Sequence, residues 1–351
     1  MPVAFWGVFA GCWLEFPTTF SRHGWRCRYG VGKRKEMHVT AKEDIEHHRR
    51  TVDRMSRPGE ALAQDSSNIT VSNPDWFYQD GGDTMKPKPE RRMLHERLKS
   101  EYRRKWPQAK QERHAVILAG APGAGKSTLL KELLGEHLED YLVLDADEFK
   151  ELLLRQAQAD GSYESTIKPE EVHQREAAGE EFFPLELATL VHEESSQLST
   201  QLRSQCIAEG LNIVVDKVLH SADGAQQLIA ELDEAGYRVE IVEVRVPFEV
   251  SQQRITQRWE EAYEASLAGE DDLGARWVPY QFARKVFDAP GDKSKPEIVA
   301  EKLAFESPAV LRYRAYRTAD SDTADADDFG SLEVDMCRSG YGAKLTSTPQ
   351  R

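Results

Sequence analysis

Through the middle of the chain, short apolar runs alternate with longer stretches of helical periodicity. The apolar runs are nearly continuous in Val, Ile and Leu, which is typical of parallel strands buried on both faces. Because the charges within 238–246 suit a less buried strand, we place that strand nearer the edge of the sheet. The alternation predicts an α/β fold with a mostly parallel sheet and helices on both faces. We expect strands at 115–120, 141–145, 212–216, 238–246 and within 311–318, and helices at 126–134, 185–209, 223–235 and 248–268.

Both ends of the chain lack this alternation. Residues 1–36 make a poor signal peptide and suit a disordered extension or a translation start at Met37. Residues 40–87 are polar and interrupted by Pro and Gly, with at most one helix around 43–55. A run of aspartates without core residues begins at Asp320. These patterns predict a largely disordered extension and linker at 1–87, a folded domain at 88–318 and an acidic disordered tail at 319–351.

The composition restricts the class of protein. The 351 residues are 40% hydrophobic and 30% charged, which is enough for one good core. No apolar run approaches the ~20 residues of a membrane span. A net charge of -14 disfavours a general polyanion binder. The four cysteines are scattered without a C-x-x-C pair, so neither a zinc site nor a disulfide framework is indicated, and we expect a reducing cytoplasm.

A phosphate-binding pattern follows the first predicted strand. Residues 120–127 fit G-x-x-x-x-G-K-[ST], between an apolar strand and a helix-forming stretch. Glycines let successive backbone N–H groups point at phosphates, the lysine reaches the β- and γ-phosphates, and the serine hydroxyl can bind Mg²⁺ at a helix N-terminus. The pattern predicts that ATP or GTP binds to Gly120, Ala121, Pro122, Gly123, Ala124, Gly125, Lys126, Ser127 and Thr128.

Acidic residues stand at the ends of two further predicted strands. Asp145 and Asp147 follow one apolar run, and Asp216 ends the next. In an open parallel sheet, ligands bind beyond the carboxyl ends of the strands, so we expect these carboxylates near the phosphate loop. A kinase needs a carboxylate to orient or deprotonate the attacking hydroxyl; we assign this role to Asp147, and Mg²⁺ support to Asp145. The same spacing also fits a helix N-cap and a first-turn acid.

A series of motifs follows the first predicted strand in a fixed order. These are the phosphate loop at 120–128, Asp-Ala-Asp-Glu-Phe-Lys at 145–150, His-Glu-Glu-Ser-Ser at 192–196, Asn-Ile-Val-Val-Asp at 212–216, Arg254 with Arg258, and Arg-Trp-Val-Pro at 276–279. In their order and spacing, over roughly 92–318, the chain resembles the zeta toxin family of P-loop kinases. The resemblance implies ATP-dependent phosphorylation of a sugar hydroxyl, with UDP-N-acetylglucosamine the substrate of the best-known members.

The resemblance also implies roles for single residues. Asp147 is then the catalytic base and Lys126 the lysine of the phosphate loop, while Arg258 and Arg276 neutralise the phosphates. A planar guanidinium suits bidentate contacts with phosphoryl oxygens. On spacing alone, Arg254 and Arg258 lie one helical turn apart and fit an ordinary exposed basic stripe equally well.

The acceptor side of the site departs from the family pattern. The resemblance implies that Glu194 and Ser195 face the acceptor, although acids on a helix surface give the same sequence. Family members usually follow the acid of the third strand with Gly-Thr or Gly-Ser, whereas here Asp216 is followed by Lys217 and Val218. The hydroxyl of that Thr or Ser is therefore missing here. Its loss bears on which substrate is bound more than on whether phosphoryl transfer takes place. We expect Asp216 to contribute to substrate binding as well, and Lys217 is either an added cation near a diphosphate or a solvated loop lysine.

Two other functions fit parts of the sequence. The basic segment 86–113 could bind nucleic acid and make the protein a nucleic-acid-dependent NTPase. Its apolar residues instead follow a helical stripe, which favours a helix packed on the core; the stripe comprises Met93, Leu94, Leu98, Tyr102 and Trp106. Another small-molecule or polynucleotide kinase on the same fold is the stronger alternative. An antitoxin protein is a further partner to consider, although nothing in the chain identifies one.

Overall fold

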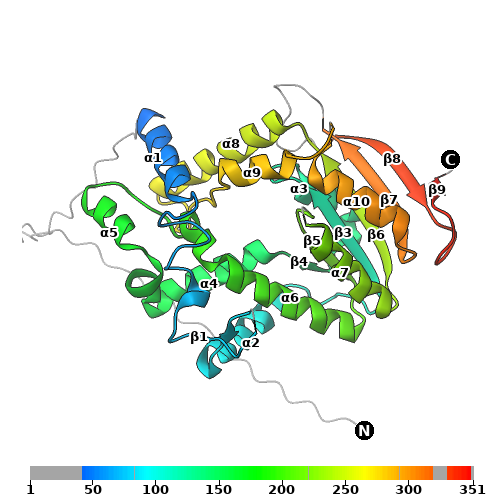
Figure 1. Ribbon diagram of the computed structural model, residues 1–351, viewed down its shortest axis with the longest axis horizontal. Coiled ribbons are helices and arrows are strands. Elements are labelled where there is room, and N and C mark those ends of the chain that lie inside the picture. Colours follow the sequence, from blue (N-terminus) through cyan, green and yellow to red (C-terminus); the bar gives the residue numbers. More distant parts are fainter. Residues whose placement is uncertain (1–41, 83, 220, 292, 319–329, 349–351) are drawn as a thin grey trace, which may run out of the picture. The chain divides into compact units, whose positions relative to one another are not determined.

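The computed structural model describes residues 42–82, 84–219, 221–291, 293–318 and 330–348 (Figure 1). The expectations for 1–36 and for the aspartates at 320–328 lie outside these ranges. The strands are β1 (Phe77–Tyr78), β2 (Lys86–Pro87), β3 (His114–Gly120), β4 (Leu142–Leu144), β5 (Ile213–Asp216), β6 (Arg238–Arg245), β7 (Val310–Arg317), β8 (Ser331–Cys337) and β9 (Thr346–Ser347).

The α-helices are α1 (Lys42–Met55), α2 (Pro89–Arg103), α3 (Lys126–Leu134), α4 (Ala146–Asp160), α5 (Glu170–Ala177), α6 (His192–Glu209), α7 (Ala222–Glu234), α8 (Phe248–Leu267), α9 (Tyr280–Phe287) and α10 (Lys295–Glu306). Short 3₁₀ helices occur at η1 (Thr70–Ser72), η2 (Gly135–Asp140) and η4 (Pro184–Val191), and η3 (Tyr163–Ile167) is a π-helical turn.

The central sheet has seven strands in the order β4-β5-β3-β6-β7-β8-β9. The first five strands in this order are parallel to one another, and β8 and β9 are added in antiparallel orientation. The predicted mostly parallel sheet is therefore confirmed. The predicted edge position of 238–246 was wrong, because β6 lies between β3 and β7. Its charges are tolerated there because Glu240 pairs with Arg314 on β7, and the buried Glu243 pairs with Arg245 and Tyr313.

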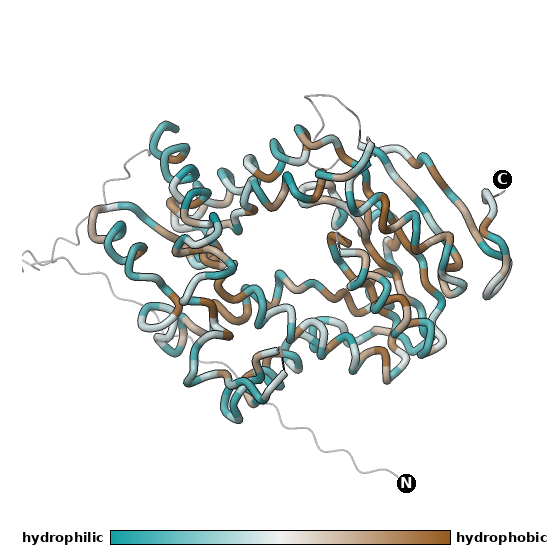
Figure 2. Tube along the Cα trace, in the orientation of Figure 1, coloured by the Kyte–Doolittle hydropathy of each residue, from teal (hydrophilic) through white to brown (hydrophobic). Residues whose placement is uncertain are grey.

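Helices cover both faces of the sheet, as the strand pattern predicts. Alternate residues of β3 enter two different hydrophobic clusters, since successive strand side chains point to opposite faces. Ala115, Ile117 and Ala119 join a cluster that includes residues of α6, α7 and α10. Val116 and Leu118 join a second cluster with residues of α3 and the start of α8. Figure 2 shows the most hydrophobic segments along these strands and hydrophilic residues along the outer helices.

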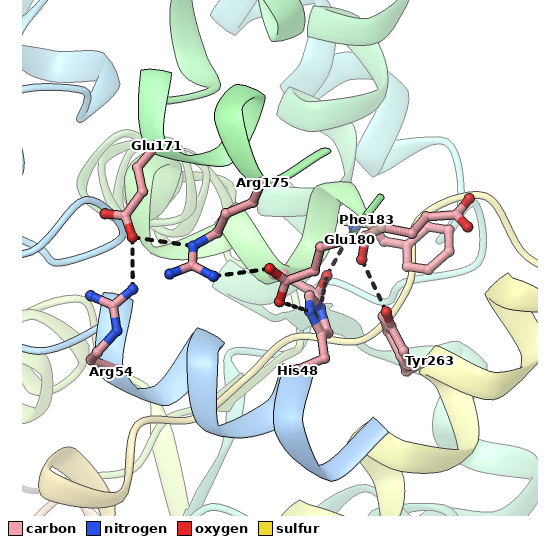
Figure 3. A network of polar contacts seen from close by, with 9 residues as sticks. His48, Arg54, Glu171, Arg175, Glu180, Phe183 and Tyr263 are labelled. Carbon is pink, nitrogen blue, oxygen red and sulfur yellow. Dashed lines mark hydrogen bonds and ion pairs between the residues drawn. The ribbon is translucent and has the colours of Figure 1, made fainter. Parts of the chain in front are cut away.

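The segment expected to be a linker is part of the folded core. The helix expected around 43–55 forms α1, and its residues Ile45, Val52 and Met55 are buried in the larger cluster together with Leu62. Buried His48 lies between Glu180 and Glu186 and stacks on Tyr263 of α8 (Figure 3). The polar composition of the segment conceals the packing of this helix in the core, because its apolar residues occupy a single narrow face.

The segment after 329 also differs from the expected disordered tail. Strand β8 pairs with β7 over its length and forms the outer part of the sheet with β9 (Figure 1). Its acids are neutralised by arginines of the neighbouring strands, as in the pairs of Asp335 with Arg312 and Glu333 with Arg317. These ion pairs between neighbouring strands stabilise the acidic segment as a strand, so that it does not have to remain solvated as a disordered tail.

Helix α2 packs on the core, as its apolar stripe predicts. Leu98 and Tyr102 are buried, whereas Met93, assigned to the same stripe, is exposed. Two of its arginines are paired with acids of α6, Arg91 with Glu194 and Arg103 with Glu209. None of the helices in the described ranges is both long and apolar enough to cross a membrane.

Met55→Ala tests whether α1 belongs to the core. Met55 is 0% exposed, so its truncation should lower the free energy of unfolding by about 2 to 5 kcal/mol through lost burial and a residual cavity. Urea titration followed by circular dichroism measures the change. Met93→Ala is the matched control: this methionine is 68% exposed, and we expect a change within about 0.5 kcal/mol. Equal effects of the two substitutions would contradict a core position for α1.

Candidate active site

The phosphate loop links β3 to α3 and is held against β6 and α8. A Cβ atom at Gly120 would lie 2.7 Å from the carbonyl oxygen of Val244, and one at Gly123 would lie 2.9 Å from that of Ser251. Both glycines have positive φ, which side chains disfavour. The Ser251 hydroxyl also donates to the Pro122 carbonyl at 2.9 Å. The loop therefore has its shape before any ligand binds.

Lys126 lies across the loop at the start of α3. Its Nζ donates to the Gly120 carbonyl at 3.3 Å and lies 3.7 Å from Oδ1 of Asp216 at the end of β5. The Ser127 side chain next to it is exposed. An ammonium, a hydroxyl and the free N–H groups of a helix N-terminus thus converge on one region, which is the arrangement that binds phosphate.

Asp145 directly follows β4 and is the N-cap residue of α4. Its Oδ1 accepts a hydrogen bond of 2.8 Å from the backbone N–H of Asp147, so the N-cap interpretation of Asp145 holds. Burial raises the pKa of Asp145 to about 7, and the negative charge of Asp216 adds to this effect, while Arg276 and Lys126 oppose it. Two acids therefore lie close enough to repel each other beside Lys126.

Asp147, in the first turn of α4, is held by two cations. Its Oδ1 lies 2.9 Å from Nζ of Lys150, and its Oδ2 forms an ion pair with Arg276. The Asp147 side chain is 39% exposed, whereas Lys150 is buried, and burial lowers the pKa of Lys150 to about 8. Lys150 ends the Asp-Ala-Asp-Glu-Phe-Lys motif, and no role was predicted for it. It could have been found from its position three residues after Asp147 on a helix, because side chains at this spacing are neighbours.

The two predicted phosphate-binding arginines lie on different elements. Arg258 is an exposed residue of α8, and Arg276 lies in the segment between α8 and α9 with its side chain 25% exposed. Burial lowers the pKa of both guanidinium groups, and the negative charge of Asp145 opposes this in each case. The side chain of Arg258 reaches solvent, but the protein around it, including Asp145, still shifts the pKa of its guanidinium. Arg254, one turn earlier, is buried against Gly123 of the phosphate loop, so the two arginines do not form one exposed stripe.

The residues predicted to contact the acceptor are not all placed for it. Glu194 is fully buried and accepts hydrogen bonds from Arg91 at 2.6 and 2.8 Å, and its Oε1 lies 2.7 Å from Nε2 of His95. Burial opposes its ionisation, yet these partners lower the pKa of Glu194 to about 2. Ser195 is also buried and donates to the His192 carbonyl at 2.8 Å. We therefore withdraw the expectation that these two side chains contact the acceptor, because Glu194 joins α6 to Arg91 and His95 of α2, and Ser195 bonds to the backbone of its own helix.

Lys217 and Val218 follow Asp216 at the end of β5. The Lys217 side chain is exposed, although burial of its ammonium and the nearby charge of Arg203 lower its pKa. Val218 is half-buried and packs against the second core cluster. The site therefore brings together Lys126, Asp145, Asp147, Lys150, Asp216, Arg258 and Arg276, whereas Lys217 lies at its margin.

The parallel sheet, the phosphate loop and the converging charges define a P-loop kinase fold. Residues 99–170 and 171–295 match the family model described as Zeta toxin, which is more than half of the chain. The protein belongs to the zeta toxin family. This confirms the resemblance that the motifs indicated.

Solved structures support the same fold. A crystal structure of AvrRxo1-ORF1:-ORF2 with ATP aligns with a TM-score of 0.51 and 20% identity, covering 74% of this chain and 70% of that chain. The structure of the same complex with sulphate ions aligns with a TM-score of 0.50 at the same identity and coverage. No curated protein matches the chain significantly.

Asp145→Asn tests the repulsion within the acidic pair. The folded-state pKa of Asp145 is about 7, above its ordinary value of 3.8, so its contribution to stability is full below about pH 4 and is lost as the pH rises through 7. The amide should therefore make the metal-free protein more stable than the parent at pH 8, by on the order of 1 kcal/mol or more, with no gain at pH 4.

Urea titrations in EDTA across this pH range measure that difference. Asp147→Asn is the matched control, because it removes a carboxylate held by Lys150 and Arg276 and should lower stability at pH 8. A destabilisation by Asp145→Asn at pH 8 as large as that by Asp147→Asn would contradict the repulsion.

Proposed function

We propose that this protein transfers the γ-phosphate of ATP to a hydroxyl group of a UDP-linked amino sugar such as UDP-N-acetylglucosamine. The observation that carries the proposal is the position of Asp147, a carboxylate held by Lys150 and Arg276 beside a preformed phosphate loop. A base, several cations and a phosphate cradle are the components that phosphoryl transfer requires.

The phosphate loop supports ATP as the donor. Lys126 bonds weakly to the Gly120 carbonyl at 3.3 Å, and phosphate oxygens are stronger partners for an ammonium group. The N–H groups at the start of α3 are directed at the same place. A structure of similar fold has been solved with ATP.

The donor set fits Mg²⁺. Ser127 offers an exposed hydroxyl, and Asp145 and Asp216 offer carboxylates, which are the oxygen ligands that this cation prefers. The raised pKa of Asp145, caused by burial and by Asp216, marks a place where added positive charge is favourable. When bound, Mg²⁺ neutralises phosphate charge and orients the γ-phosphate. We assign Ser127 and Asp145 to hold it.

Asp147 is the general base of this proposal. Its carboxylate oxygen takes the proton of the acceptor hydroxyl while the hydroxyl oxygen bonds to the γ-phosphorus, and the bond from that phosphorus to the β,γ-bridging oxygen breaks, releasing ADP. A carboxylate paired with two cations is a weak base, so Arg276 has to leave Asp147 for the phosphates. Arg276 and Arg258 then stabilise the charge on the transferred group.

The class of acceptor molecule is the most specific part of the proposal, and we propose a UDP-sugar. A UDP-sugar presents two phosphates and a hydroxyl-rich ring, and Lys217 offers a cation next to Asp216 at the same end of the sheet. Glu194 is committed to Arg91 and His95 and is not assigned to the acceptor. Another small-molecule or polynucleotide acceptor is the alternative. Nucleic acid is disfavoured because cations of α2 are paired with acids.

A protein partner such as an antitoxin is also proposed, because the similar AvrRxo1-ORF1 was solved in complex with ORF2.

We propose that the protein acts in the cytoplasm, where ATP is available and where free thiols such as those of Cys206 and Cys337 are stable.

Asp147→Asn tests the assignment of the base. We expect it to retain ATP binding and to lower the rate of phosphoryl transfer by ~10² to 10⁴, because the amide cannot accept the hydroxyl proton. Asp145→Asn should act mainly on the Mg²⁺ dependence of the rate. Calorimetry with Mg-ATP and a coupled ADP assay separate the two effects. If Asp145→Asn loses more transfer than Asp147→Asn at saturating Mg²⁺, the two roles are reversed.

Val218→Thr tests the acceptor. Restoring a hydroxyl at this position should raise kcat/KM for UDP-N-acetylglucosamine about tenfold to a hundredfold, as expected for ~1 to 3 kcal/mol from one hydrogen bond. Val218→Ala is the control for a change of size alone. Mass spectrometry of the products identifies the acceptor. Absence of a phosphorylated UDP-sugar from both the parent and Val218→Thr, with clear transfer to another acceptor, would remove the UDP-sugar proposal and leave the kinase.

A further inference from the structure

We infer that α1 is a positioning element for Arg276, and that Asp53 is the residue through which it acts. Helix α1 lies outside residues 99–295, the part of the chain that matches the family model. The inference rests on the proposed phosphoryl transfer, because that proposal gives Arg276 its role.

Asp53 holds the segment that carries Arg276. Its Oδ1 accepts hydrogen bonds from the indole Nε1 of Trp277 and from the backbone N–H of Tyr280, both at 3.2 Å. These two donors follow Arg276 by one and four residues. One carboxylate oxygen thus fixes both the side chain next to Arg276 and the first residue of α9.

Trp277 is enclosed from several sides. It is 6% exposed, lies edge-on to Trp259 of α8, and has the guanidinium of Arg49 from α1 above its ring at 5.4 Å. Arg49 is itself held by Glu46 through two hydrogen bonds of 2.7 Å. The segment after Arg276 is therefore packed between α1 and α8.

Helix α1 is fixed to the rest of the domain independently of Asp53. His48 lies 2.7 Å from Oε1 of Glu180 and 3.0 Å from Oε1 of Glu186, and its ring stacks on Tyr263 of α8 (Figure 3). Burial disfavours the charged form of His48, but the two glutamates raise its pKa to about 9. A helix held in this way can serve as a fixed support for the Arg276 segment.

The consequence concerns the position of Arg276 on Asp147. The guanidinium has to pair with Asp147 and then move to the phosphates, and both positions need the same backbone anchor. Loss of the anchor should misplace Arg276 without removing it. Small misplacements of a catalytic group lower the rate far more than they lower ligand affinity.

Asp53→Ala tests this anchor. We expect kcat to fall about tenfold to a hundredfold, with the affinity for ADP changed less than twofold, because the phosphate loop is untouched. Asp53→Asn keeps an acceptor oxygen and should retain kcat within about twofold of the parent. Arg54→Ala is the matched control: it removes an ion pair of α1 that does not reach the Arg276 segment, and it should leave kcat unchanged.

A double substitution shows whether Asp53 acts through Arg276. In an Arg276→Ala background, Asp53→Ala should cause no further loss of kcat, because the two residues form one unit. Fully additive losses would overturn the inference, and so would equal losses of kcat in Asp53→Ala and Arg54→Ala.

Hydrogen exchange of the Tyr280 amide separates this inference from the proposed function. Exchange should be faster in Asp53→Ala than in the parent, Asp53→Asn or Arg54→Ala, whatever the acceptor is. Unchanged exchange in Asp53→Ala would overturn the anchor. Failure of the parent to phosphorylate any acceptor would instead count against the proposed function and leave the exchange result standing.

Discussion

The ion pair between Arg276 and Asp147 is the interaction on which the rest of the site depends. It joins the segment after α8 to the first turn of α4, and Lys150, one turn further along α4, pairs with the other carboxylate oxygen of Asp147. Four cations at 126, 150, 258 and 276 face three carboxylates at 145, 147 and 216. The site therefore carries a small net positive charge. In the proposed mechanism, the phosphates of the donor compete with Asp147 for Arg276, and this competition would couple the arrival of the donor to the release of the base.

Much of the fold and part of the site could be predicted from local sequence. The phosphate loop is recognisable because its glycines and Lys126 serve one backbone geometry wherever it occurs. The strands around it are continuous apolar runs, and the acids that follow them have to meet at the carboxyl edge of a parallel sheet. Asp145, Asp147 and Asp216 were placed correctly at this edge for that reason.

The features that sequence reasoning missed depend on contacts between distant segments. Helix α1 has a polar composition, and only its packing against Glu180, Glu186 and α8 makes it part of the core. Strand β8 is acidic and becomes a strand because β7 supplies arginines opposite its acids. Glu194 resembled a substrate ligand until Arg91 and His95, a hundred positions away in the chain, were seen to occupy its carboxylate.

Transfer of the γ-phosphate of ATP to a small-molecule hydroxyl can be measured directly by following the label of γ-labelled ATP. The purified protein is incubated with Mg²⁺, γ-labelled ATP and a small-molecule extract of cells, and the labelled products are separated and identified by mass spectrometry. The account predicts one organic phosphate monoester, formed in equal amount to ADP and absent with Lys126→Ala. Label found only as inorganic phosphate, or only on the protein itself, would contradict it.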